Sequence, residues 1–221
     1  MPIFNGTLPE LDMKEAKRCA SLKTNQDFSD DIAADACMAV QAIAKPCGIF
    51  QQCYYDSEAY TLLCDAPFTI AGKQVRDHLG YAEIIVVMAV TIGGAVEDEI
   101  DHCFLAKEYT KGLMLDAAAT AATEMVADQL NSYIDEIAAK KGYKTTWRYS
   151  PGYGDWPLNQ QIDLVKALHA DQIGISVTES MMLVPRKSIT AIIGLKRDAA
   201  TGCGPNSCAG CSMSGCHSRM G

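Results

Sequence analysis

The sequence contains 221 residues, of which 48% are hydrophobic, and its formal net charge at pH 7 is −8. A chain of this length can bury a substantial core as one large domain or two small ones. Because no basic block accompanies the negative charge, nucleic acid and membranes are poor candidates for a partner, and a protein or a small molecule is favoured.

The start of the sequence does not combine a basic segment with the apolar run of a secretion signal. Nowhere do about 18 uncharged apolar residues follow one another. We therefore expect a cytoplasmic protein whose thiols stay reduced. Six of the ten cysteines are scattered through patterned segments and are expected to be small buried hydrophobic residues: Cys19, Cys37, Cys47, Cys53, Cys64 and Cys103.

The N-terminal segments are predicted to be helical. Residues 9–22 form a modest candidate, and residues 28–46, "FSDDIAADACMAVQAIAKP", form a stronger one. In the second segment Ser29 is suited to cap the helix, two aspartates follow in the first turn, and Pro46 comes after the end.

A β-hairpin is predicted next, from residues 48–55 and 59–64, which are separated by short polar residues. The short stretch 71–80 is assigned no element. Residues 82–94, "AEIIVVMAVTIGG", are apolar and β-branched enough for a central strand. Residues 95–109 again have a helical pattern.

The clearest helix covers residues 112–140. Its apolar and small residues recur at intervals of four, which places them on one face of a helix. Gly142 follows directly after its last lysines, as is common where a helix ends. The residues of this face are Met114, Ala118, Ala122, Val126, Leu130, Ile134 and Ala138.

The remaining pattern is a strand at 145–149, a turn-rich loop, a helix at 158–170, and strands at 173–179 and 187–195. Strands mixed with helices and joined partly by hairpins are typical of an α+β domain. We therefore predict a twisted, largely antiparallel sheet with packed helices.

The loop "RYSPGYGDWP" is the first candidate recognition element, because its glycines and prolines exclude a regular helix. Arg148 offers a planar fork for a carboxylate, and the face of Tyr153 attracts a cation. A small zwitterion would suit this set. The alternative is that Trp147 and Tyr153 pack under the loop while Arg148 forms an ordinary ion pair.

Glu124 is a second candidate, since small residues surround it at helical-neighbour spacing and leave room beside its carboxylate. The alternative is a solvated helix glutamate. Asp116 and Asp128, on the same helix, receive less weight. The irregular segment 177–188, "VTESMMLVPRKS", is interpreted as a bulge in an edge strand.

The last residues contain Cys203, Cys208, Cys211 and Cys216 with the spacing C-x4-C-x2-C-x4-C. Four thiolates would hold a zinc ion or an iron–sulfur cluster, and the alternative is a reduced tail without metal. No P-loop, no G-x-G-x-x-G, no G-x-S-x-G and no H-E-x-x-H motif is present, so a nucleotide-binding enzyme of those types or a hydrolase has little support.

Three segments together resemble one known family: "LMLDAAATAATEMVADQL", "TWRYSPGYGDWPL" and "GISVTESMMLVPRKSITAIIG". In this order they resemble the activation domain of cobalamin-dependent methionine synthase, and most of all the free-standing small proteins of that family. The likeness extends over about residues 80–197. It predicts an activation-domain-like α+β domain over residues 1–200 and a cysteine-rich tail over 201–221.

The resemblance implies a shallow site for S-adenosylmethionine. Arg148 would hold the ligand carboxylate, and Glu124 would pair with a polar or cationic group of the ligand. Backbone groups of the loop would contact its adenosyl and methionyl parts, namely those of Ser150, Pro151, Gly152 and Tyr153. The chain departs from the family in having no tyrosine after Tyr153.

The function implied is the reactivation of a corrinoid enzyme by reductive methylation of cob(II)alamin to methylcobalamin. The partner would be a corrinoid-binding methionine synthase that lacks its own activation domain, or a related corrinoid protein. Cobalamin would sit on that partner, and flavodoxin or ferredoxin would donate the electron. Asp155 and Trp156 are expected to face the partner.

Two alternatives come from other classes of protein. One is a binding module without turnover, which senses S-adenosylmethionine or the corrinoid protein. The other is a carrier of metal or of an iron–sulfur cluster through the cysteine tail. A cluster in the tail would also allow the chain to deliver the electron itself.

Overall fold

The computed structural model describes residues 1–20 and 29–197. The tail cysteines, Cys203, Cys208, Cys211 and Cys216, lie outside the described residues. Within the described ranges, no helix combines the length and the apolar character needed to cross a membrane.

A seven-stranded sheet forms the centre of the fold, and all of its pairings are antiparallel. The order across it is β4-β3-β2-β5-β9-β6, and β1 pairs with the start of β2. The predicted α+β class is confirmed. The strands of the sheet are β1 (Ile3–Asn5), β2 (Cys47–Asp56), β3 (Thr61–Leu63), β4 (Phe68–Thr69), β5 (Ile84–Thr91), β6 (Tyr143–Thr145) and β9 (Ser188–Arg197).

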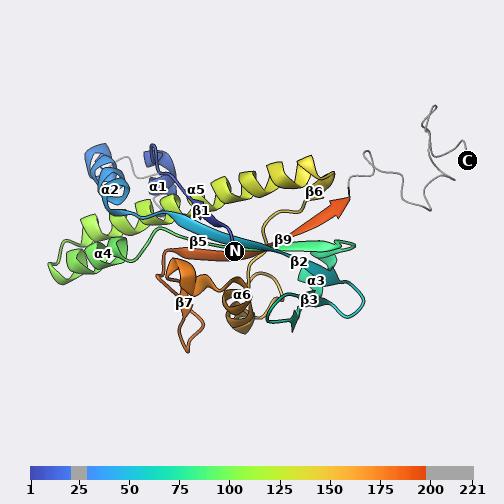
Figure 1. Ribbon diagram of the computed structural model, residues 1–221. Coiled ribbons are helices and arrows are strands. Elements are labelled where there is room, and N and C mark those ends of the chain that lie inside the picture. Colours follow the sequence, from blue (N-terminus) through green and yellow to red (C-terminus); the bar gives the residue numbers. More distant parts are fainter. Residues whose placement is uncertain (21–28, 198–221) are drawn as a thin grey trace, which may run out of the picture.

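Helices cover both faces of the sheet (Figure 1). Helix α5 crosses one face, with α1, α2 and α4 gathered near its N-terminal end, and α3 and α6 cover the other face. Two short 3-10 turns, η1 (Leu158–Gln160) and η2 (Ala170–Ile173), flank α6. The helices are α1 (Met13–Cys19), α2 (Asp30–Ile43), α3 (Lys73–Leu79), α4 (Ala95–Leu105), α5 (Tyr109–Lys140) and α6 (Gln161–Leu168).

The central position of strand β5 explains why its sequence is apolar without interruption. It pairs with β2 on one side and with β9 on the other along its whole length. Val86, Met88 and Val90 belong to the core under α5, whereas Val87 and Ala89 belong to the core under α3 and α6. Since successive side chains of a strand point to opposite faces, both faces need apolar residues.

The predicted apolar face of α5 is confirmed, because all seven of its residues are buried. Its alanines at positions 118, 122 and 138 carry little volume, which lets this helix lie close to the sheet. The predicted cap of α2 is also present, because Ser29 Oγ accepts a hydrogen bond from the N–H of Asp31 at 3.2 Å.

The cysteines of the described residues are free thiols. Burial raises the pKa of the Cys53 thiol to about 12.

The strand predicted over 173–179 is confirmed only for Ser176–Val177, and the bulge predicted over 177–188 is wrong. The chain forms a hairpin there instead, from β7 (Ser176–Val177) and β8 (Leu183–Val184), which make a separate two-stranded sheet. Thr178 closes its turn: its N–H donates to the Met182 carbonyl at 2.9 Å, and its hydroxyl oxygen accepts from the Met182 N–H at 3.1 Å. The short ladder between β7 and β8, closed by the Thr178 hydroxyl, takes the place of the expected bulge.

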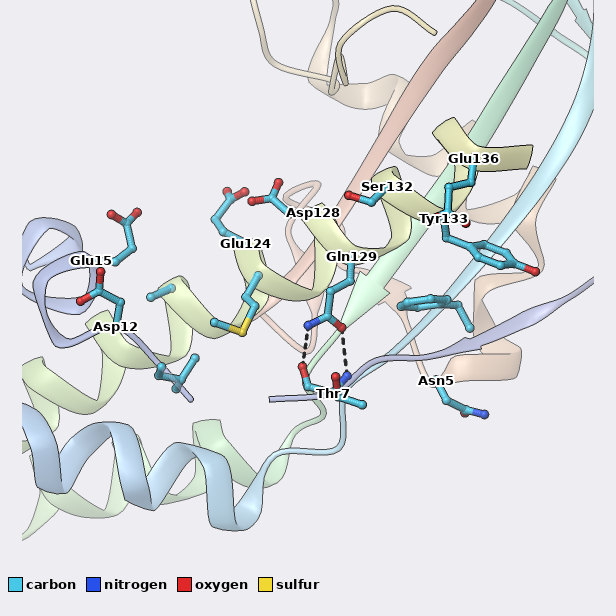
Figure 2. Close-up of a pocket in the computed structure, with 14 residues that line it drawn as sticks. Asn5, Thr7, Asp12, Glu15, Glu124, Asp128, Gln129, Ser132, Tyr133 and Glu136 are labelled. Carbon is cyan, nitrogen blue, oxygen red and sulfur yellow. Dashed lines mark hydrogen bonds between the residues drawn. The ribbon is translucent and has the colours of Figure 1, made fainter. Parts of the chain in front are cut away.

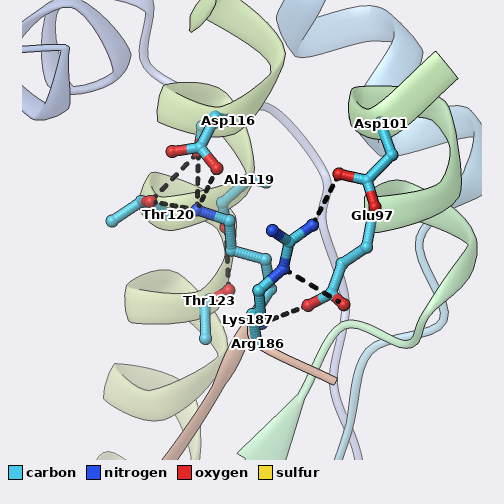
Figure 3. Close-up of polar contacts among 8 residues, drawn as sticks. All are labelled: Glu97, Asp101, Asp116, Ala119, Thr120, Thr123, Arg186 and Lys187. Atoms are coloured by element: carbon cyan, nitrogen blue, oxygen red, sulfur yellow. Dashed lines mark hydrogen bonds and ion pairs between the residues drawn. The ribbon is translucent and has the colours of Figure 1, made fainter. Parts of the chain in front are cut away.

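Two basic residues tie the start of β9 to the helices (Figure 3). The Lys187 ammonium lies 2.9 Å from an Asp116 carboxylate oxygen and donates to the Thr120 hydroxyl, also at 2.9 Å, so it holds β9 against α5. Arg186 pairs with Asp101 of α4 at 2.8 Å, and this bond raises the pKa of Arg186. The start of β9 is therefore held by side chains as well as by strand pairing.

Helix α3 was not predicted, and its cap comes from far along the chain. Asp155 accepts hydrogen bonds from the N–H groups of Lys73 at 2.6 Å and Gln74 at 2.9 Å. A Cβ atom on Gly72 would lie 2.8 Å from the Asp155 carbonyl oxygen, so the glycine permits this close approach. Asp155 thus has a role in the fold.

Trp156 does not face a partner, and the expectation that it does is wrong. Its side chain is buried, and its Nε1–H donates to Gln160 Oε1 at 2.6 Å. Gln160 also accepts from the N–H of Ala71 and donates to the carbonyl of Thr69, both at 2.7 Å. This network joins the loop to β4.

We expect Asp155→Ala to lower the free energy of unfolding by about 1–2 kcal/mol, because two N–H groups of the first turn of α3 lose their acceptor. Urea denaturation followed by circular dichroism measures the effect. Asp77→Ala, which changes an exposed aspartate within α3 itself, is the matched control and should change stability much less. Equal effects of the two substitutions would contradict the capping role.

Candidate functional site

A row of polar residues follows α5 on the side away from its apolar face. The row recurs at intervals of four, so its members are neighbours on successive turns. Figure 2 shows four of them, Glu124, Asp128, Ser132 and Glu136, along one side of the helix. Lys187 meets the beginning of the row, and Arg148 meets its middle.

Arg148 and Glu124, both predicted as site residues, are brought together. Arg148 Nη2 lies 3.2 Å from Glu124 Oε2 and 2.8 Å from Asp128 Oδ1. The Arg148 side chain is only 21% exposed, whereas those of Glu124 and Asp128 are 48% and 72% exposed. The Arg148 side chain is thus mostly buried, and its guanidinium meets the two carboxylates at the protein surface.

The other terminal nitrogen of Arg148, Nη1, is buried and has no hydrogen-bond partner among the described residues. A buried donor without a partner costs free energy, and a charged one costs more. An incoming carboxylate that displaced the atoms covering Nη1 would satisfy this donor while Nη2 stays on α5. The observation fits a ligand with an anionic group at this point.

The backbone around Arg148 is fixed by β9. The N–H of Thr146 donates to the Gly194 carbonyl at 2.9 Å, and Tyr149 exchanges hydrogen bonds with Ile192 at 3.0 and 2.9 Å. Strand β6 ends at Thr145, so residue 148 lies in an extended connection between two points of attachment. The predicted strand 145–149 is therefore broken, and its break directs Arg148 toward α5.

Two clefts open beside this cluster. The first has a volume of about 560 Å³ and is lined by Asp128, Asn131, Ser132, Trp147 and Arg148. The second, of about 730 Å³, lies between α5 and the N-terminal segment, and Asp128 lines both clefts. The carboxylates along the second cleft are Asp12, Glu15, Glu124, Asp128 and Glu136 (Figure 2). A cation would find a favourable potential here.

The N-terminal wall of the second cleft is held to α5 by a pair of hydrogen bonds. The Thr7 N–H donates to Gln129 Oε1 at 3.0 Å, and Gln129 Nε2 donates to the Thr7 carbonyl at 2.8 Å (Figure 2). Sequence reasoning missed this wall, because nothing near Thr7 indicates a partner 122 residues away. It also underrated Asp128, whose spacing of four from Glu124 was the available signal.

The loop 150–153 forms a tight turn stabilised by its own backbone. Tyr153 N–H donates to the Ser150 carbonyl at 3.1 Å, and Gly152 N–H donates to the Trp156 carbonyl at 2.9 Å. Gly152 has a φ of +89°, a conformation that favours glycine. Pro151 has no N–H, and the Tyr153 carbonyl already accepts from the Trp156 N–H at 3.0 Å, so the carbonyl groups of Pro151 and Gly152 are the backbone acceptors that the segment 151–153 leaves for a ligand. The predicted ligand contacts of this loop stay a prediction.

The alternative interpretation of the loop is only partly correct. Arg148 does form ion pairs, as this interpretation predicts. Trp147 and Tyr153, however, do not pack under the loop, since they are 62% and 59% exposed.

Among the described residues, no group of three or more histidine, cysteine, aspartate and glutamate side chains could hold a metal ion.

Comparison with known proteins identifies relatives of this chain. A family model described as "Vitamin B12 dependent methionine synthase, activation domain" matches residues 12–201. The methionine synthase of Mycobacterium leprae (strain TN) is 23% identical over 150 residues, and the match covers 59% of this chain and 12% of that protein. The chain therefore corresponds to a small part of that relative.

A solved structure supports the fold. The crystal structure of the MetH reactivation domain bound to AdoHcy has a TM-score of 0.61 against this chain, at 15% sequence identity. The match covers 87% of this chain and 77% of the other. The likeness is one of architecture, since few residues are identical.

We expect Arg148→Met to change the free energy of unfolding by no more than about 1 kcal/mol, because its acceptors are exposed and the methionine keeps an apolar stem. Urea denaturation again supplies the measurement. Gln160→Leu is the contrasting variant: it leaves the buried Trp156 Nε1–H and the partly buried Ala71 N–H unpaired and should cost about 2 kcal/mol or more. A loss at Arg148 as large as that at Gln160 would mean that the cluster serves the fold.

Proposed function

The chain belongs to the family of vitamin B12 dependent methionine synthase activation domains, and we propose that it binds S-adenosylmethionine and supports the reactivation of a corrinoid enzyme. The match of the family model over residues 12–201 supports the family role. The observation that carries the proposal for this chain is the buried, unpartnered Nη1 of Arg148, which lies beside two carboxylates.

The chemistry of the cluster fits the ligand. S-adenosylmethionine has a carboxylate, an ammonium group and a sulfonium cation. In the proposed complex, Arg148 Nη1 donates to the ligand carboxylate, which gains a charge-assisted hydrogen bond. Glu124 and Asp128 lie on the solvent side of the same guanidinium and are available to the cationic groups.

Asp128 has a second part in the proposal, as a residue that positions Arg148. Its 2.8 Å contact with Nη2 is shorter than the 3.2 Å contact of Glu124. A guanidinium held by one nitrogen presents the other in a fixed direction, which lowers the cost of ordering it on binding. The backbone of Ser150, Pro151, Gly152 and Tyr153 is proposed to line the rest of the ligand.

In the proposed reaction, an external donor gives one electron to cob(II)alamin, and the cobalt then takes the methyl group of S-adenosylmethionine, which leaves methylcobalamin and S-adenosylhomocysteine. The residues of this chain contribute position: they bind the amino-acid end of the ligand and direct its sulfonium outward. Transfer of a methyl cation to cobalt requires no general base.

The partner would be a corrinoid-binding methionine synthase or a related corrinoid protein, because the matching family model is that of a vitamin B12 dependent methionine synthase activation domain. A methionine synthase without its own activation domain is the partner that we propose, with flavodoxin or ferredoxin as electron donor. We place the reaction in the cytoplasm. The acidic surface of α5 would steer docking onto a basic partner face.

The cysteine tail belongs to the proposal only as an extension. Cys203, Cys208, Cys211 and Cys216 provide the spacing for a zinc ion or an iron–sulfur cluster. A cluster would let this chain pass the electron to the corrinoid itself. The support is the spacing alone.

We expect calorimetric titration to show saturable binding of S-adenosylmethionine to the wild-type protein and binding at least about tenfold weaker to Arg148→Met, equivalent to about 1.4 kcal/mol. The physical reason is the loss of the guanidinium that pairs with the ligand carboxylate. Arg197→Met removes an exposed arginine that pairs with Glu83 and is the matched control. Binding that is unaffected by Arg148→Met would contradict the proposed site.

The reaction itself is tested by mixing the protein anaerobically with a corrinoid protein in the cob(II)alamin form, titanium(III) citrate and S-adenosylmethionine. Methylcobalamin should form, and its absorption spectrum is used to follow the reaction. Its formation should require both this protein and the Arg148 guanidinium. Ligand binding without methylcobalamin would favour a binding module over a reactivating protein.

A Cys208→Ser variant separates the tail from the site in the same assay. With titanium(III) citrate as the reductant it should match the wild type, because the electron does not need the tail. With reduced ferredoxin in place of the chemical reductant, its rate should fall only if the tail carries the electron.

A further inference from the structure

Trp147 is an exposed tryptophan that the proposed site does not yet use. Its side chain is 62% exposed, and it lines the 560 Å³ cleft together with Arg148 and Asp128. An exposed large aromatic side chain beside a cleft is more informative than a scattered surface residue, since contact with a ligand would remove apolar area from water.

The indole is held in place before any ligand arrives. The His78 ring lies 4.1 Å from it and the Tyr149 ring 5.0 Å, between centroids. His78 Nε2–H donates to the Trp147 carbonyl at 2.9 Å, which fixes the backbone at the same point. Burial lowers the pKa of His78, which favours the neutral form of its ring. A preorganised ring loses little freedom on binding.

The other tryptophan of the same loop has a different environment. Trp156 is 1% exposed and hydrogen-bonded to Gln160, so it belongs to the core. Among the described residues that line the 560 Å³ cleft, Trp147 provides the aromatic surface, and Asn131 and Ser132 provide neutral polar groups. This set suits a planar heteroaromatic base joined to a sugar.

We propose that the indole of Trp147 stacks on the adenine ring of S-adenosylmethionine and so selects the adenosyl part of the ligand. The inference rests on the proposed function, because Arg148 must hold the carboxylate at the other end. Trp147 and Arg148 line one cleft at the edge of the sheet, with the indole against His78 of α3 and the guanidinium on α5, so a ligand that spans this edge meets both. Stacking of a base on an aromatic side chain tolerates small shifts of the ring, which suits an open cleft.

The test compares ligands that lack one part each. S-adenosylhomocysteine keeps the adenine and has no sulfonium charge, whereas S-methylmethionine keeps the sulfonium and has no adenine. In calorimetric titrations, Trp147→Ala should weaken S-adenosylmethionine and S-adenosylhomocysteine by about tenfold or more. Trp147→Phe, which retains a ring, should stay within a few-fold of the wild type, and S-methylmethionine should bind equally to all three.

Tyr81→Ala is the matched control, since Tyr81 is 94% exposed but lines a different cleft. Thermal melting checks that each variant is folded. The fluorescence of the wild-type protein should be quenched by S-adenosylhomocysteine, and this quenching should be lost in Trp147→Phe, because Trp156 is buried away from the ligand.

Three results would overturn the inference. Unchanged affinity of Trp147→Ala for S-adenosylhomocysteine would remove the stacking. Loss of S-methylmethionine binding in Trp147→Ala would assign the indole to the sulfonium cation instead. Absence of S-adenosylmethionine binding in the wild type would remove the proposed function as well. By contrast, affinity that is reduced by Arg148→Met but not by Trp147→Ala would leave the function and remove only the role of Trp147.

Discussion

The approach of one guanidinium to two carboxylates on successive turns of α5 is the contact on which the site depends. Arg148 reaches Glu124 and Asp128 with a single nitrogen and keeps the other for a further acceptor. Two features of the fold make this possible. The apolar face of α5 brings the helix close to the sheet, and pairing with β9 on both sides of Arg148 fixes the distance between strand and helix. The site is therefore a product of the sheet edge and one long helix.

The segment from Trp147 to Gln160 divides its residues between fold and surface. Asp155 caps α3, and Trp156 with Gln160 joins the loop to β4, so these residues hold the turn in place. Trp147 and Tyr153 remain exposed next to the guanidinium. A binding loop requires a rigid backbone with exposed side chains. The conformational entropy of the backbone is then lost during folding and is not lost again when a ligand binds.

The elements that local pattern determines were predictable from the sequence, and those that distant contacts determine were not. The repeat of apolar residues in α5 and the continuous apolar run of β5 follow from burial of one face and of two faces. Helix α3 was missed because its cap lies in the chain about 80 residues later. The importance of Asp128 and of the wall at Thr7 became evident only when Arg148 and Gln129 were placed beside them. Trp147 and Trp156 could not be told apart from sequence, since their burial depends on tertiary contacts that the local pattern does not show.

The most direct measurement is a crystal structure of the protein grown with S-adenosylmethionine. The account predicts a ligand carboxylate within hydrogen-bond distance of Arg148 Nη1, with Nη2 still on Asp128. A ligand bound elsewhere, or one whose carboxylate meets another cation while Arg148 stays on α5 unchanged, would contradict the central claim.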